Sequence, residues 1–179
     1  MDVSDRTELF APDLQAEIKE RFFFVDEDHL GRRRLFFENS GGSLRLKACI
    51  DAVVKYDSHP DCPGRHQKQA DILGELVTRG YDDLRIIFNT KKGSIATCLS
   101  ASQCMFNIVE AIATNVPGKN MVVSVIEHPS AFDSVEYYAK RTNRELRVMM
   151  PNPVTGAVEL SEVAKYVDKD TLLFSCMYS

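Results

Sequence analysis

The chain has 179 residues, of which 44% are hydrophobic, 27% charged and 9% aromatic. That is enough apolar material for a folded core, so the composition excludes disordered, collagen-like and low-complexity proteins. Lys and Arg total 22 against 26 Asp and Glu, and the resulting net charge of −4 gives no general attraction to nucleic acid or anionic membranes. The apolar stretches are also far shorter than the roughly 20 residues that cross a bilayer as a helix.

The N-terminus and the cysteines indicate a cellular compartment. The opening residues, Met-Asp-Val-Ser-Asp-Arg, are acidic and polar and do not resemble a secretory signal. The five cysteines are widely spaced and include no Cys-x-x-Cys pair, which is typical of reduced cytosolic proteins. We therefore expect a soluble, cytoplasmic protein.

The first part of the chain predicts short helices. Residues 1–35 are polar and charged, and we expect an N-terminal arm with one helix that begins at Pro12. A second helix is expected after Ser43, a good N-cap residue, and a third is expected to stop at Gly80. The apolar residues expected to face inward are Leu14, Ile18 and Phe22 in the first helix, Leu46, Ile50, Ala52 and Val53 in the second, and Ala70, Leu73, Leu76 and Val77 in the third.

Strand and helix patterns alternate with short connections from residue 84 onward. The expected strands are 84–88, 121–126, 146–150 and 171–177, and the expected helices are 100–114, one that begins at Pro129, and 161–168. The inward residues of the first two of these helices are Met105, Ile108, Val109 and Ile112, and Phe132, Val135 and Ala139. Such alternation predicts the α/β class, with a mainly parallel sheet flanked by helices. Strands 121–126 and 171–177 are nearly continuous apolar runs, so we expect both to be buried.

The last residues, 171–179, form an apolar strand pattern without a polar tail. A strand covered on both faces is usually followed by a covering helix. We therefore expect these 179 residues to be the N-terminal part of a longer protein.

Several familiar sites are absent or incomplete. No Gly-x-Gly-x-x-Gly follows a strand and no P-loop motif occurs, which disfavours dinucleotide dehydrogenases and P-loop enzymes. His59, Cys62 and His66 have spacing that metal ligands use, with Asp61 as a fourth candidate, but a solvent-exposed polar loop is the simpler interpretation. The tract 32–34, three arginines, could bind an anion, although charge runs are more often solvated and acidic residues lie just upstream.

A cysteine nucleophile is a further alternative. Cys98 or Cys104 could act as nucleophile with His128 as its base. Nothing in the sequence fixes such a pair in space, and thiols at apolar positions are usually inert. A structural role is the simpler interpretation.

Two segments favour a phosphorylated ligand. Ser100, Ala101 and Ser102 are small residues at the start of a helix, where backbone N–H groups and hydroxyls suit a phosphate, although Ser is also an ordinary helix cap. The segment Glu127-His128-Pro129-Ser130 directly follows the buried strand 121–126, so His128 lies close to the end of that strand. In an open α/β sheet, ligands bind at the carboxyl ends of the strands, so this histidine is a candidate functional residue.

The order of these motifs resembles a known family. An Asn-Ser-Gly-Gly-Ser turn (39–43) follows an aromatic strand, and the small-residue turn then opens a helix. Glu-His-Pro-Ser (127–130) follows a strand, and Gly-Ala-Val-Glu-Leu (156–160) comes before the strand Thr-Leu-Leu-Phe-Ser. Over residues 35–179 this resembles the class V aminotransferase family of fold type I pyridoxal-phosphate enzymes, which includes cysteine desulfurases and selenocysteine lyases. The resemblance implies that 36–179 is the N-terminal part of the large, cofactor-binding domain.

The resemblance also implies roles for individual residues. It places His128 on the pyridine ring of pyridoxal 5′-phosphate, where the family's histidine stacks and relays protons. It places the cofactor phosphate on the turn Ser100, Ala101 and Ser102, and the substrate beside the small residues Gly41 and Gly42. His66 matches a family histidine near the partner subunit's site.

This sequence departs from the family pattern in two respects. Ser100, Ser102 and Gln103 stand where the family usually has Gly, Thr and Glu. The family's pyridine-nitrogen aspartate, its Schiff-base lysine and the desulfurase cysteine are all expected beyond residue 179. The resemblance therefore implies a homodimeric, pyridoxal-phosphate-dependent transferase or lyase that acts on an amino acid, with only part of its site in this chain. Whether the reaction is transamination, desulfuration, racemisation or elimination stays open, and the alternative is a non-catalytic relic or interaction domain without the lysine.

Overall fold

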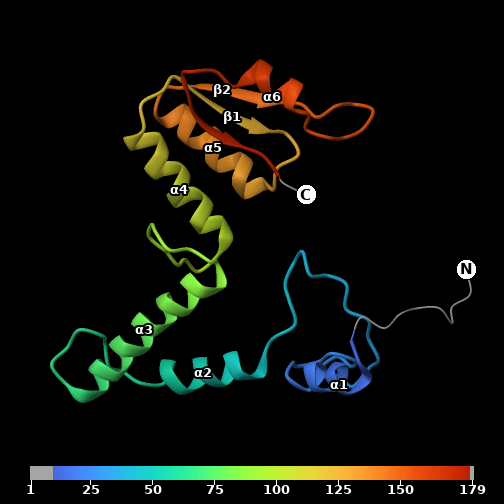
Figure 1. Ribbon diagram of the computed structural model, residues 1–179, viewed down its shortest axis with the longest axis vertical. Coiled ribbons are helices and arrows are strands. Elements are labelled where there is room, and N and C mark those ends of the chain that lie inside the picture. Colours follow the sequence, from blue (N-terminus) through green and yellow to red (C-terminus); the bar gives the residue numbers. More distant parts are fainter. Residues whose placement is uncertain (1–9, 178–179) are drawn as a thin grey trace, which may run out of the picture. The chain divides into compact units, whose positions relative to one another are not determined.

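The computed structural model describes residues 10–177, and the chain divides into two units, which Figure 1 shows from blue-green to yellow-red. The first unit ends at Lys92 and the second begins at Gly93. The expected boundary between an arm and a domain after residue 35 stays a prediction. Within the described residues, no helix has the length and apolar character needed to cross a membrane.

The first unit contains three helices, α1 (Pro12–Glu20), α2 (Lys47–Asp57) and α3 (Lys68–Ile87). The predicted start of α1 at Pro12 is confirmed. After α1 the chain forms a hairpin closed by a bridge between Glu27 and Arg33, and a second antiparallel bridge joins Phe22 to Leu46.

The start of α2 corrects the prediction of an N-cap at Ser43. The helix begins at Lys47, and the preceding residues are extended. The reason is backbone pairing: the Phe23 N–H donates to the Arg45 carbonyl at 3.0 Å, and the Lys47 N–H donates to the Arg21 carbonyl at 2.9 Å. Since residues 45–46 bind the segment after α1, they are unavailable for the first helical turn.

The predicted strand at 84–88 is wrong, and so is the predicted helix end at Gly80. Helix α3 continues through Gly80 to Ile87, and the chain leaves it at Asn89, which has a left-handed backbone with φ +48°. A short apolar run fits a strand and a helix equally well, and here the apolar residues continue the helical spacing of Leu73 and Val77. Asn tolerates the left-handed conformation that ends many helices, so the stop signal is Asn89 and not the glycine.

The inward faces predicted for the first unit are mostly uncovered. Of its described apolar residues only Ala70 and Leu73 are buried. Leu14 is 44% exposed, and in α2 Ile50 is 39% and Val53 60% exposed. The amphipathic pattern is therefore present, but these apolar faces do not find a partner within the unit.

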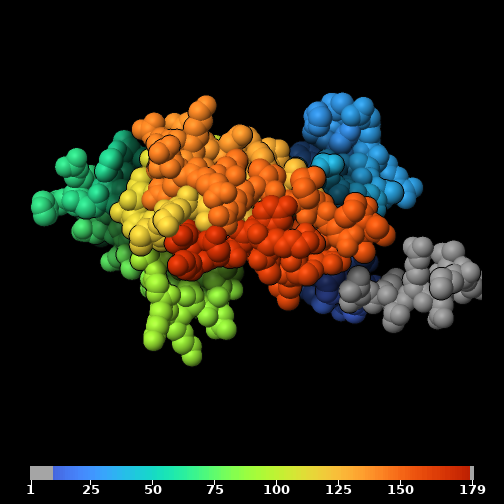
Figure 2. Space-filling view, turned by 90° about the horizontal axis from the view of Figure 1, so that it is seen from above, coloured from blue at the N-terminus to red at the C-terminus, as the bar shows by residue number. Residues whose placement is uncertain are grey.

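The second unit carries the predicted parallel sheet. Its elements are α4 (Ala101–Asn115), β1 (Asn120–Ser124), α5 (Pro129–Arg141), β2 (Glu145–Met149), α6 (Leu160–Tyr166) and β3 (Thr171–Ser175). The three strands are all parallel, in the order β2-β1-β3, and helices flank the sheet (Figure 1). The predicted α/β class is therefore confirmed. The space-filling view shows this part of the chain, yellow to red, as one continuous packed body (Figure 2).

The core of the second unit lies between β1 and the helices α4 and α5. Every residue of β1 is buried, as predicted for the central strand, and the buried cluster consists of Val109, Ala113, Met121, Val123, Val135, Tyr138 and Ala139. Three expectations fail. The predicted buried strand 121–126 ends at Ser124, and Val125 and Ile126 are 42% and 38% exposed. Strand β3 is only half-buried, with Phe174 37% exposed, because it lies at the edge of the sheet, and Ile108 of α4 is 55% exposed.

Hydrogen bonds from the Arg144 side chain stabilise the amino edge of this sheet. The Arg144 guanidinium donates to the carbonyls of Ala113 at 2.5 Å, Gly118 at 3.2 Å and Val116 at 3.3 Å, which satisfies carbonyls at and after the end of α4. This edge is therefore fastened by hydrogen bonds, which leaves the opposite, carboxyl edge as the place for a ligand.

Candidate functional site

The N-termini of α4 and α5 lie at the carboxyl edge of the sheet. Helix α4 leads into β1 through the short segment 116–119, so its C-terminus is at the amino edge, whereas α5 starts just after the carboxyl end of β1. The two helices pack together through Phe106, whose ring centroid is 6.4 Å from that of Tyr137 and 6.3 Å from that of Tyr138. Both helices run away from the same edge (Figure 1). The fold thus brings the Ser100–Ser102 turn and His128 to one edge of the sheet.

The two serines at the start of α4, Ser100 and Ser102, have different roles. Ser100 is the N-cap, and its hydroxyl oxygen accepts the Gln103 N–H at 3.2 Å. The Gln103 side chain in turn accepts the Leu99 N–H at 3.1 Å. Ser100 is therefore occupied as a helix cap. The backbone N–H groups of Ala101 and Ser102 belong to the first turn, which has no acceptor within the helix, and the exposed Ser102 hydroxyl lies beside them.

His128 is exposed at the end of β1 and is the N-cap of α5. Its Nδ1 accepts the Ser130 backbone N–H at 3.2 Å and lies 2.8 Å from the Ser130 hydroxyl. Because Nδ1 accepts a hydrogen bond, the neutral ring carries its proton on Nε2. The cap therefore fixes the tautomer and leaves Nε2 and the ring face open. The sequence analysis did not predict that His128 caps α5, although a proline at the first helical position, here Pro129, indicates that the preceding residue is the N-cap.

Glu127 is a polar residue of this edge whose importance was not evident from the sequence. Its Oε1 atom is buried and has no hydrogen-bond partner among the described residues. A buried carboxylate oxygen without a donor is costly, so such an atom marks a place where a further group belongs. The only signal in the sequence is a charged residue directly after a buried strand.

The structure does not support the cysteine alternative. Cys104 forms a side-chain hydrogen bond with Cys98, and this bond, together with burial, raises the pKa of the Cys104 thiol. The Asn107 amide donates to the Cys98 sulfur at 3.6 Å. A raised pKa disfavours the thiolate that a nucleophile needs, and His128 is engaged with Ser130 and not with either thiol.

The polar loop and the arginine tract have local partners. Within residues 10–177, no group of three or more His, Cys, Asp or Glu side chains is arranged to hold a metal ion. Asp61 accepts a hydrogen bond from Gln67. In the tract 32–34, Arg32 pairs with Asp28 at 2.7 Å and lowers the pKa of that carboxyl, as the acidic residues upstream suggested.

Gly41 and Gly42 lie in an exposed turn of the first unit. A Cβ at Gly41 would meet the Glu38 carboxylate at 3.3 Å, and that carboxylate also accepts the Ser40 hydroxyl at 2.6 Å. Gly42 has open space around it. Their expected role beside a substrate stays a prediction.

The fold of this chain is similar to that of a solved protein, a cysteine desulfurase from Thermococcus onnurineus NA1 in its apo form. The two share 14% sequence identity with a TM-score of 0.72, and the match covers 94% of this chain and 40% of the other. The chain thus spans less than half the length of that protein. No family model and no curated protein matches the sequence. At this identity the likeness establishes the fold.

Proposed function

We propose that this chain is part of a pyridoxal-phosphate-dependent enzyme that acts on an amino acid, with the cofactor at the carboxyl edge of the sheet. The observation that carries the proposal is the pairing of two features at that edge. One is the free donor set at the start of α4, and the other is the exposed His128 ring at the start of α5. The similarity in fold to a cysteine desulfurase supports the same enzyme class.

The residues at the start of α4 fit a phosphate. The Ala101 and Ser102 N–H groups and the Ser102 hydroxyl are donors at the positive end of a helix of 15 residues. Ser102 would bind the phosphate directly, whereas Ser100, whose oxygen caps the helix, would hold the turn in shape. This division refines the roles that the sequence implies for the two serines.

His128 fits the cofactor's ring. Its Nδ1 is held by Ser130, the next residue is Pro129, and His128 itself is exposed. It would stack on the pyridine ring, and Nε2, which carries the proton, would exchange it with the substrate or solvent. When bound, pyridoxal phosphate supplies an electron sink for negative charge at the substrate Cα. The orphaned Glu127 Oε1 would accept a donor from the complete site.

The wider assignment follows the same resemblance. Gly41 and Gly42 would line the substrate side, and the protein would be a homodimer in the cytoplasm. Transamination, desulfuration, racemisation and elimination are all compatible with the residues described.

The phosphate anchor is tested by cofactor binding, measured from the visible absorbance of pyridoxal phosphate during a titration. Ser102→Ala should weaken binding by about tenfold, because it removes a hydrogen bond to a charged group. Ser161→Ala, at the exposed start of α6, is the matched control and should leave binding unchanged. Pyridoxal, which lacks the phosphate, should bind wild type and Ser102→Ala equally. Equal weakening of both ligands by Ser102→Ala would contradict a phosphate at this turn.

The role of His128 requires variants that separate capping from stacking. His128→Asn keeps a good N-cap but loses the ring, so the protein should stay stable and bind the cofactor weakly. His128→Phe keeps a ring but loses the cap, so cofactor binding should persist while the free energy of unfolding falls by about 0.5–2 kcal/mol. If His128→Asn binds the cofactor like wild type, His128 is only a helix cap and the proposed site is wrong.

A further inference from the structure

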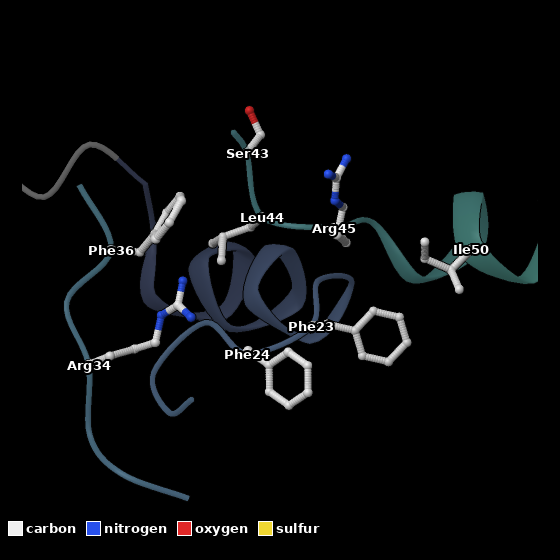
Figure 3. A pocket seen from close by; sticks show the side chains of 8 residues that line it. All are labelled: Phe23, Phe24, Arg34, Phe36, Ser43, Leu44, Arg45 and Ile50. Atoms are coloured by element: carbon white, nitrogen blue, oxygen red, sulfur yellow. The ribbon is translucent and has the colours of Figure 1, made fainter. Parts of the chain in front are cut away.

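The first unit contains a pocket of about 390 Å³, and none of its lining residues belongs to the proposed cofactor site (Figure 3). Its apolar walls are formed by Phe23, Phe24, Phe36, Leu44 and Ile50, and its charged lining residues are Arg34 and Arg45. A volume of this size is within the usual range for small-molecule sites.

Backbone hydrogen bonds build this pocket from three segments. The segment after α1 is bound to the segment before α2 through Phe23 and Arg45, at 3.0 Å. The returning arm of the hairpin is held by the Arg34 N–H, which donates to the Asp26 carbonyl at 2.9 Å. These two bonds tie the three segments together before any ligand is present, which reduces the entropy cost of binding.

Arg34 is half-buried, and its guanidinium has no carboxylate partner among the described residues. The nearby acids are already engaged, since Asp26 pairs with Lys19 at 2.8 Å and Asp28 pairs with Arg32 at 2.7 Å. The guanidinium instead lies over the Phe36 ring, 4.7 Å from its centroid. Figure 3 shows it turned toward the space between Phe36 and Leu44, whereas the Arg45 side chain points away. Stacking fixes the plane of the guanidinium and leaves its N–H edges free to donate.

Phe24 adds a second unusual feature to the same pocket. It has a left-handed backbone with φ +54°, which is rare for a bulky residue, and the residue is 52% exposed. Strained residues of this kind concentrate at ligand sites and switch regions. Here the strain places a second Phe ring beside Phe23, with the ring centroids 6.1 Å apart.

We propose that this pocket binds a small aromatic carboxylate, with the ring among Phe23, Phe24 and Phe36 and the carboxylate on the Arg34 guanidinium. A planar carboxylate matches the paired donors of a guanidinium, and an aromatic ring matches the phenylalanine walls. A neutral aromatic molecule would leave Arg34 unpaired, and a small hydrophilic anion would leave the walls uncovered. The lining residues all lie within residues 23–50, and none of them is a residue proposed to bind pyridoxal phosphate, so the proposal does not rest on the cofactor site.

The test is a titration of the whole chain with 3-phenylpropionate, followed by calorimetry and by NMR shifts of the Phe ring signals. We expect 3-phenylpropionate to bind saturably. The neutral 3-phenylpropionamide should bind at least about tenfold more weakly, because it cannot form the charge-assisted hydrogen bonds. Acetate, which lacks the ring, should not bind measurably. Absence of saturable binding, or equal affinity for acid and amide, would overturn the proposal.

Two variants locate the anion. Arg34→Gln should weaken 3-phenylpropionate by about tenfold or more while leaving the affinity for the amide unchanged. Arg33→Gln removes the same charge from the neighbouring exposed position, and the affinity should stay within about twofold of wild type because exposed charges are screened. Equal losses in the two variants would mean that general charge, and not this pocket, attracts the ligand. The amide titration also reports whether Arg34→Gln still has a folded pocket.

Discussion

The two units of this chain bury their apolar residues to very different extents. Among the described residues, twelve apolar side chains are buried, and only Ala70 and Leu73 belong to the first unit. In the second unit β1 is completely buried between its neighbours. In the first unit, most of the apolar faces of α2 and α3 remain exposed.

The difference shows what amphipathic patterning alone can provide. A strand that pairs on both sides and packs against helices removes its apolar surface from water within a few residues of chain. A helix buries its apolar stripe only when another element lies against it. The stability of this chain should therefore reside in the second unit, and the following substitutions test that difference.

The largest expected contrast is between two valines in helices. Val135 in α5 is fully buried, whereas Val53 in α2 is 60% exposed. Val135→Ala should lower the free energy of unfolding by about 1.5–3 kcal/mol, through lost burial and a cavity. Val53→Ala should change it by less than about 0.5 kcal/mol, since an exposed side chain loses little. Urea unfolding curves measure both values, and an equally large loss for Val53→Ala would show that α2 is covered in solution.

Substitution of two glycines by alanine should change the stability of the protein in opposite directions. A Cβ at Gly118 would lie 2.7 Å from the Leu172 Cβ and 2.9 Å from the Asp170 carbonyl oxygen, so Gly118→Ala forces β3 away from the start of β1. We expect a loss of about 1–3 kcal/mol, as for other overpacked sites. Gly80 lies in the middle of α3 with open space around it, and Gly80→Ala should stabilise the helix by about 0.5–1 kcal/mol.

Thermal unfolding of the two variants measures whether each is more or less stable than wild type. A stabilised Gly118→Ala protein would mean that β3 does not approach the segment before β1 this closely. A destabilised Gly80→Ala protein would mean that α3 breaks at this glycine, as the sequence first suggested.

The fold of the second unit could be predicted because its signals agree. Pro129 marks a helix start, the run at 121–126 is long enough for a central strand, and the connections are short. The strand prediction at 84–88 was wrong because four apolar residues within five positions fit either a strand or a helix, and only the continuation of the helical spacing from Leu73 decides for a helix. The prediction of an N-cap at Ser43 was wrong because the preference of Ser for that position is weaker than the backbone pairing of residues 45–46 with the segment after α1.

The candidate site could be predicted only in outline. The sequence places Ser100 and Ser102 at the start of a helix and His128 after a buried strand. The topology then brings all three to one edge of the sheet. The sequence could not show that Ser100 and His128 both serve as helix caps, because capping depends on the side-chain rotamer. The orphaned oxygen of Glu127 likewise depends on three-dimensional burial.

The smallest expected effect concerns acid stability of the second unit. The Asp168 carboxylate accepts hydrogen bonds from Arg147 at 2.8 Å and from Asn120 at 3.1 Å, which ties β2 and β1 to the segment before β3. These bonds, Arg147 first, hold the pKa of Asp168 well below its usual range. The side chain is 46% exposed, so solvent screens the interaction and keeps its contribution small.

The sign of the effect follows from the direction of the shift. A carboxyl whose pKa is lower in the folded state binds fewer protons than in the unfolded state, so it adds stability above the ordinary Asp value of about 3.9 and loses it as the pH falls further. Asp168→Asn should therefore lower the free energy of unfolding at pH 7, and the difference from wild type should shrink steadily as the pH falls below about 4. Asp133→Asn, on the exposed face of α5, is the control and should give a pH profile parallel to wild type. Urea unfolding at a series of pH values measures this, and a difference between Asp168→Asn and wild type that does not change with pH would mean that the charge of Asp168 is not what holds the strands together.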